Sequence, residues 1–116
     1  TYLTDNDANG YDGTDDIMDM TGQDEVNITV ARNGNFQMQP AAARISEGTT
    51  VVWTWDSAGH SVSYREGSTD DEFNDGGASA SAGRTFEHTF ENGTGEVLYR
   101  CNPHAAQGHY AALIVE

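Results

Sequence analysis

The chain has 116 residues, enough for one domain around one hydrophobic core, and its 19 acidic and 5 basic residues give a formal charge of -14. This charge argues against nucleic-acid binding, a single cysteine excludes an internal disulfide framework, and no apolar run approaches the roughly 20 residues of a membrane helix. An acidic surface without Lys is typical of proteins from very salty cells. The alternative is an acidic face that docks a basic partner at low salt.

Residues 1–24 are rich in Asp, Gly and Asn, with scattered apolar residues such as Leu3, Tyr11 and Ile17. We expect an irregular acidic N-terminal arm that lies against the domain and uses some of these residues as anchors, the alternative being a disordered arm. The chain opens without the basic and apolar regions of a signal peptide. We therefore expect a removed export segment or a module of a longer protein, and the sequons at Asn27 and Asn92 are weak indications of export.

From residue 25 onward, short segments alternate between apolar and polar residues, which predicts the strands of an all-β sandwich. The predicted strands cover residues 26–30, 36–45 with an interruption at Pro40, 51–55, 60–64, 86–90, 97–101 and 111–115. A long acidic connection rich in Gly, Ser and Ala covers residues 66–84. The domain is therefore expected over residues 25–116, without a helix.

Several aromatic side chains and one histidine alternate with polar neighbours, which assigns them to inward faces. We expect Trp53 and Tyr99 in the core, with Trp55 nearer the end of the sandwich at which Cys101 lies. His88 alternates with two phenylalanines, so we expect it to be structural rather than a ligand.

A cysteine and two histidines are placed to meet at one end of this sandwich. Cys101 ends an inward-facing strand, His104 lies on the loop directly after it, and His60 opens a different strand. One thiolate and two imidazoles on a rigid β framework, with a weak fourth ligand, are typical of a blue-copper electron-transfer site. Against this, a Cys-x-x-His pair alone is a weak signal and a lone buried Cys is usually a small hydrophobe, whereas zinc would favour a second Cys.

Motifs along nearly the whole chain strengthen the copper interpretation. They are the runs at 2–13, 20–26, 40–42, 45–55, 59–62 (Gly-His-Ser-Val), 85–90 and 101–108 (Cys-Asn-Pro-His-Ala-Ala-Gln-Gly). In order and spacing these runs resemble halocyanin domains, the blue-copper cupredoxins of haloarchaea. The resemblance implies a Greek-key β-sandwich, of about seven to eight strands, and one copper ion held by His60, Cys101 and His104. It also implies one-electron transfer on the extracytoplasmic face.

One position departs from the family pattern, in which a Met, the axial ligand, follows the glycine that here is Gly108. His109 occupies that position. Imidazole is a harder and stronger donor than a thioether, so we expect His109 to be a fourth ligand that favours Cu(II), lowers the reduction potential and moves the colour from blue toward green or red. The alternative is that His109 turns to solvent, leaving three ligands or a distant fourth from water, Gln107 or the carbonyl of Gly59.

We therefore predict a mononuclear copper electron carrier, not an enzyme, that shuttles one electron between Cu(II) and Cu(I) with a transient redox protein partner. Electrons are expected to leave through the edge of His104, beside a small apolar docking face formed by Ala105, Ala106, Tyr110 and Ala41–Ala43. The alternatives are a copper site with an open position that reacts with nitric oxide or superoxide, and a copper-binding or storage module. We expect the protein on the outer face of the cell membrane, peripheral or anchored through a missing N-terminal segment, with no nucleic-acid partner and no membrane span.

Overall fold

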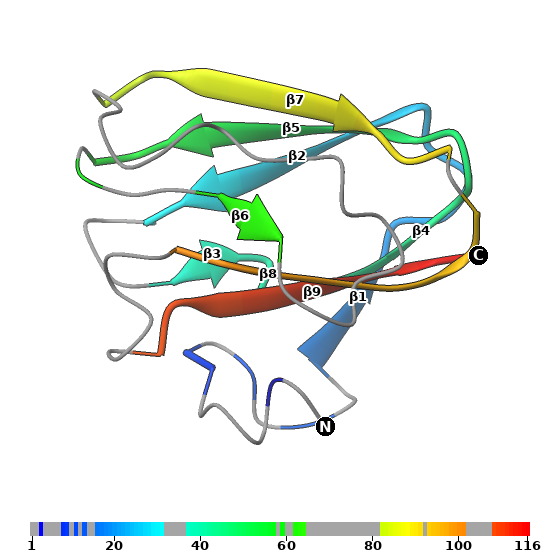
Figure 1. The fold of residues 1–116 in the computed structure, drawn as a ribbon, viewed down its shortest axis with the longest axis horizontal. Helices are drawn as coiled ribbons and strands as arrows, with labels where there is room; N and C mark the ends of the chain where they lie inside the picture. Colours follow the sequence, from blue (N-terminus) through cyan, green and yellow to red (C-terminus); the bar gives the residue numbers. More distant parts are fainter. Residues whose placement is uncertain are drawn as a thin grey trace.

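The structure is a computed structural model, and it describes residues 3, 8–9, 11, 13, 16–31, 37–57, 59, 62–64, 82–91, 93–101 and 108–116. Within these residues nine strands form two sheets that pack face to face (Figure 1). No helix in this part of the chain is long and apolar enough to cross a membrane.

The first sheet has five strands, in the spatial order β1 (Ile17–Asp19), β4 (Ala42–Ile45), β9 (Tyr110–Val115), β8 (Gly95–Arg100) and β6 (Ser63–Tyr64). The second has four strands, in the order β3 (Met38–Gln39), β2 (Glu25–Val30), β5 (Thr50–Trp55) and β7 (Thr85–Thr89). The pairs β1–β4, β4–β9 and β2–β5 are parallel, and the others are antiparallel. The predicted all-β sandwich is confirmed.

The strand count exceeds the prediction for two reasons: the predicted segment 36–45 forms two strands, β3 and β4, and β1 lies within the segment that we expected to be irregular. Its three residues do not alternate in burial, so no periodic signal marks them. The strand forms by parallel pairing with β4, where Ile17 lies opposite Ala42 and Asp19 opposite Arg44. Neighbouring backbone, rather than local propensity, therefore makes this strand.

The core lies between the two sheets and is centred on Trp53. Its ring centroid lies 5.6 Å from that of Tyr99, which belongs to the opposite sheet, and 5.7 Å and 6.1 Å from those of Phe86 and Phe90. Trp53 and Tyr99 are fully buried, as the alternation of their strands predicts. Large aromatic surfaces removed from water in this way dominate the stability of a small domain.

A second, smaller cluster lies on the outer face of the five-stranded sheet. It buries Leu3, Ala8 and Ala42, with Tyr110 and other partly exposed residues packed against them. Our prediction that Ala41–Ala43 belongs to an exposed docking face is wrong, because these residues are 4%, 4% and 0% exposed. Ala42 lies beneath residues from the start of the chain and Ala43 faces the main core.

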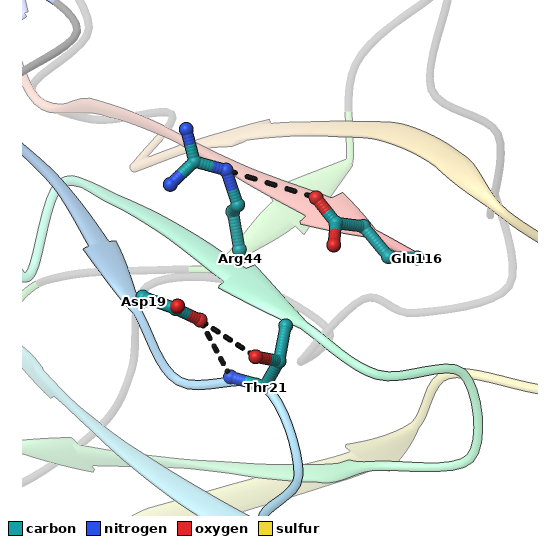
Figure 2. Close-up of polar contacts among 4 residues, drawn as sticks. All are labelled: Asp19, Thr21, Arg44 and Glu116. Carbon is teal, nitrogen blue, oxygen red and sulfur yellow. Dashed lines mark hydrogen bonds and ion pairs between the residues drawn. The ribbon is translucent and has the colours of Figure 1, made fainter.

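Polar contacts tie down the end of β1 and the C-terminus (Figure 2). Asp19 Oδ1 accepts hydrogen bonds from the hydroxyl and the backbone N–H of Thr21, at 2.7 Å and 3.1 Å. These bonds, led by that of the hydroxyl, lower the pKa of Asp19 below its usual value of 3.8. Arg44 Nε lies 3.7 Å from Glu116 Oε1, but both side chains are well exposed and such a pair contributes little to stability.

Candidate metal centre

Two of the four predicted copper ligands, Cys101 and His109, belong to the part of the chain that the structure describes. His60 and His104 lie outside the described residues, as do Ala105 and the acceptor Asn92. Among the described residues, no three His, Cys, Asp or Glu side chains gather into a group suited to a metal ion. The geometry of the site therefore rests on the Cys101–His109 pair.

Cys101 directly follows β8 and His109 directly precedes β9, so the two residues extend an antiparallel ladder. The backbone N–H of Cys101 donates to the carbonyl oxygen of His109 at 3.0 Å, one step beyond the Arg100–Tyr110 pair. Both side chains continue the buried sets of their strands, Cys101 after Tyr99 and His109 before Ala111. Side chains directly opposite in such a ladder have Cβ atoms about 4.5–5.5 Å apart. The thiol and the imidazole are thus neighbours on the inner face.

A tight turn brings His109 to this inward position. Gly108 has φ = +87°, a left-handed conformation that favours glycine, and its carbonyl oxygen accepts a hydrogen bond from the N–H of Tyr110 at 2.9 Å. A bond between residues i and i+2 closes a γ-turn centred on His109, and turns of this kind are common at strand ends. The Gly-His order in the sequence therefore places the imidazole at the first inward position of this edge of the core.

Both donor side chains are completely buried, with 0% of Cys101 and 0% of His109 exposed. The alternative in which His109 turns to solvent is not what the structure shows. A soft thiol sulfur and an imidazole nitrogen, adjacent and removed from water, are a donor pair that fits copper. The residues present at this end are thus compatible with the predicted ligand set.

Trp55 lies at the same end of the sandwich. β5 and β8 both end at the end of the sandwich at which β9 begins (Figure 1). Trp55 takes the next inward position after Trp53 in β5, and Cys101 takes the next inward position after Tyr99, just beyond β8. The indole is buried, and the guanidinium carbon of Arg84 lies 4.8 Å from its ring centroid. A guanidinium in this position is attracted electrostatically to the face of the ring. Trp55 is thus buried at the same end of the sandwich as the Cys101–His109 pair.

His88 lies toward the other end of the sandwich. It is paired with Val51 near the start of β5, whereas Trp55 is the last residue of that strand. Its ring is 4.8 Å from that of Phe90 in an edge-to-face arrangement. His88 therefore packs at a distance from Cys101 and does not join the candidate site.

Comparison with known proteins places this arrangement in a family. The family model of copper binding proteins, plastocyanin/azurin family, matches residues 24–116. Halocyanin from Natronomonas pharaonis is 50% identical over 118 residues, which cover 99% of this chain and 69% of the halocyanin. The chain belongs to the copper-binding plastocyanin/azurin family. The resemblance to halocyanin is confirmed, and copper is the cofactor of this cupredoxin.

Solved structures agree with the family assignment. A purple cupredoxin from Nitrosopumilus maritimus matches with a TM-score of 0.65 and 28% identity, over 78% of this chain and 99% of that one. Pseudoazurin from Methylobacterium extorquens AM1 matches with a TM-score of 0.62 and 23% identity, over 79% of this chain and 75% of that one.

A copper-containing nitrite reductase from Thermus scotoductus SA-01 matches with a TM-score of 0.65 and 19% identity, over 79% of this chain but 22% of the reductase. At identities this low the pseudoazurin and reductase matches show the fold alone. Together the neighbours establish a cupredoxin-like β-sandwich, and the family assigns a general role in copper electron transfer.

Sequence reasoning missed two contacts at this end of the molecule. The first is Arg84 over Trp55, for which the sequence carries no signal because the two residues are far apart in the chain. The second is a hydrogen bond at 2.9 Å from the N–H of Asn9 to the carbonyl oxygen of Gly108. Nothing in the sequence pointed to this contact between the N-terminal segment and the residue before His109.

Proposed function

We propose that this cupredoxin is a one-electron carrier whose copper ion would be held by His60, Cys101, His104 and His109, the last of which stands where the halocyanin pattern has a methionine. The observation that carries the proposal is the completely buried Cys101–His109 pair on adjacent strand ends. Family membership supports copper, and the halocyanin-like motifs around positions 60 and 104 support the two remaining ligands.

The protein's part in this function is to hold its donors in one geometry. When bound, copper supplies the Cu(II)/Cu(I) couple. Cys101 and His109 are fixed by the hydrogen bond between their backbones and by the β8–β9 ladder that continues from them. Because this backbone holds Cys101 and His109 in place when the charge of the site changes, the rearrangement of the donors during electron transfer stays small.

His109 sets the character of the site. An imidazole binds Cu(II) more strongly than a thioether does, so it lowers the reduction potential and weakens the bond between copper and the Cys101 sulfur. We therefore expect a colour other than blue. The neighbour from Nitrosopumilus maritimus is described as a purple cupredoxin, which supports such a colour on this scaffold.

Burial of the donors favours a carrier over a site with an open position. Cys101 and His109 are both 0% exposed, so these two donors present no surface to a small molecule such as azide. Electrons would leave through His104 to a transient protein partner, and such contacts are small, below about 1,200 Å² in total. The resemblance of the sequence motifs to halocyanin domains implies that the protein works on the extracytoplasmic face of the membrane.

Absorption spectra and reduction potentials of copper-loaded variants test this proposal. His109→Met is expected to raise the potential and move the spectrum toward that of a blue copper protein. His88→Gln is the matched control, because His88 packs against Phe90 at the other end, and it should leave both unchanged. Azide should not alter the wild-type spectrum. A His109→Met spectrum identical to that of wild type, or an azide-dependent shift, would contradict the proposal.

A further inference from the structure

The start of the chain is bonded to the turn that presents His109. The N–H of Asn9 donates to the carbonyl oxygen of Gly108 at 2.9 Å, and the neighbouring N–H of Ala8 donates to the carbonyl oxygen of Leu3, also at 2.9 Å. The same Gly108 oxygen accepts the hydrogen bond from Tyr110 that closes the turn around His109. One oxygen atom therefore joins the N-terminal segment to the γ-turn.

Apolar packing reinforces this hydrogen bond. Leu3 and Ala8 are each 5% exposed and pack against Ala42, with Tyr110 and Ala112 at the margin of the cluster. Ala42 and Ala112 are partners on adjacent strands, and their small side chains leave room for the incoming segment. Tyr110, which follows His109 directly, is therefore covered on the outer face, where the guanidinium carbon of Arg100 also lies 6.0 Å from its ring centroid.

Strand ends open more readily than strand centres because fewer contacts hold them. His109 lies at such an end, before the first residue of β9. The contacts from Leu3, Ala8 and Asn9 therefore stabilise the part of the ladder that would otherwise open first. They come from residues before 24, where the match to the family model begins.

We propose that Leu3, Ala8 and Asn9 are positioning residues for His109. Their packing and hydrogen bond hold the γ-turn closed and keep the imidazole at its inward position. When these contacts are weakened, the turn opens in a fraction of the molecules, and in that fraction His109 leaves its inward position. The effect on copper rests on the proposed function, whereas the effect on the turn does not.

Two matched leucine truncations test the proposal. Leu3→Ala removes the anchor on the outer face, and Leu113→Ala removes a buried side chain of the main core from β9, the strand that His109 directly precedes. Both variants should lose thermal stability. The N–H of Cys101 bonds to His109 and so reports on the turn. In the copper-free protein, we take the ratio of the amide exchange rate at Cys101 to the rate of the slowest-exchanging amides of β5. This ratio should rise about tenfold in Leu3→Ala and stay unchanged in Leu113→Ala.

The copper-loaded forms give a second measurement. The Leu3→Ala spectrum should contain a component that matches His109→Ala, and the Leu113→Ala spectrum should not. Equal exchange ratios in the two leucine variants would overturn the positioning role while leaving the proposed function intact. A raised ratio in Leu3→Ala with no change of spectrum in either Leu3→Ala or His109→Ala would instead show that the turn is held as proposed but that His109 is not a ligand.

A backbone variant covers the case in which Leu3→Ala does not fold. Asn9→Pro removes the N–H that reaches Gly108, and Asp16→Pro removes an N–H that bonds to Gly13 within the N-terminal segment. The exchange ratio at Cys101 should rise in the first variant and not in the second. The same ratio in both would overturn the proposal.

Discussion

The middle and the end of the β8–β9 ladder follow one backbone pattern but perform different tasks. In the middle, Leu113 faces the main core, and Tyr99, two residues before Cys101, packs against Trp53 from the other sheet. At the end, the same alternation places Cys101 and His109, which bring a thiol and an imidazole into an equally dry position. Register and alternation are thus shared, and only the residue types change. The candidate site is the last step of the core, positioned by the sheet and stabilised mainly by the aromatic middle.

The largest expected effect tests the middle. Trp53→Ala should reduce the free energy of unfolding by about 3–5 kcal/mol, because it deletes the ring on which Tyr99, Phe86 and Phe90 converge. Urea unfolding of the copper-free protein measures this loss. At a low temperature, molecules that stay folded should still bind copper with the wild-type spectrum. A loss below about 1 kcal/mol, or an altered spectrum of the folded form, would break the separation between middle and end.

Cys101→Ser tests the end. The variant should lose the absorption that copper and thiolate produce together, since no other described residue supplies a thiolate and the chain has a single Cys. Unfolding of the copper-free variant should show a smaller loss than Trp53→Ala, about 1–3 kcal/mol for a buried hydroxyl. Survival of the colour would contradict the role of Cys101, and a loss as large as that of Trp53→Ala would contradict the division of tasks.

Gly108→Ala should separate backbone strain from site geometry. Gly108 and Gly48 have similar left-handed φ values, +87° and +93°, and Gly48 lies in the turn before β5, away from Cys101. Alanine at either position should cost about 1–2 kcal/mol of stability, as measured by thermal unfolding. Only Gly108→Ala should also change the copper spectrum, because only Gly108 closes the turn at His109. Equal spectra for the two variants would show that the turn does not control the site.

Much of this architecture could be predicted from the sequence because burial alternates in the long strands. The alternation of Val51, Trp53 and Trp55 predicts an inward face, and the buried side chains confirm it. The inward direction of Cys101 follows from the same pattern. The direction of the His109 side chain could not be derived in the same way, because His109 follows a loop and precedes the alternating residues of its strand.

Contacts between distant segments could not be predicted in this way. β1 has no periodic pattern, and it forms because the backbone of β4 is available beside it. The assignment of Ala41–Ala43 to a docking face beside His104 was wrong because these residues are buried. The covering segment, which includes Leu3 and Ala8, carries no signal of where it packs.

The smallest expected effect concerns the end of β1. This strand lies outside both the middle and the end of the β8–β9 ladder, so changes there should leave both unaffected. The hydroxyl of Thr21 is the largest cause of the lowered pKa of Asp19, so Thr21→Val should raise this pKa toward 3.8. A group whose pKa is lowered by folding stabilises the protein above its ordinary pKa, and this contribution is lost as pH falls through the lowered value. NMR titration of the Asp19 carboxyl measures the shift.

Arg44→Gln is the control for this titration, because the charge of Arg44 is the smallest of the causes. It should raise the pKa of Asp19 less than Thr21→Val does. The opposite order would contradict the assignment of the shift to hydrogen bonding. Neither variant should alter the copper spectrum.

The proposed site requires that the imidazole of His109 and the sulfur of Cys101 bind the same copper ion. Electron–nuclear double resonance on the Cu(II) protein, with ¹⁵N-labelled histidine, counts the imidazoles coupled to the metal. We predict that the wild-type protein has one coupled imidazole more than His109→Met, and that His88→Gln keeps the wild-type number. The same number of coupled imidazoles in wild type and His109→Met would contradict the account.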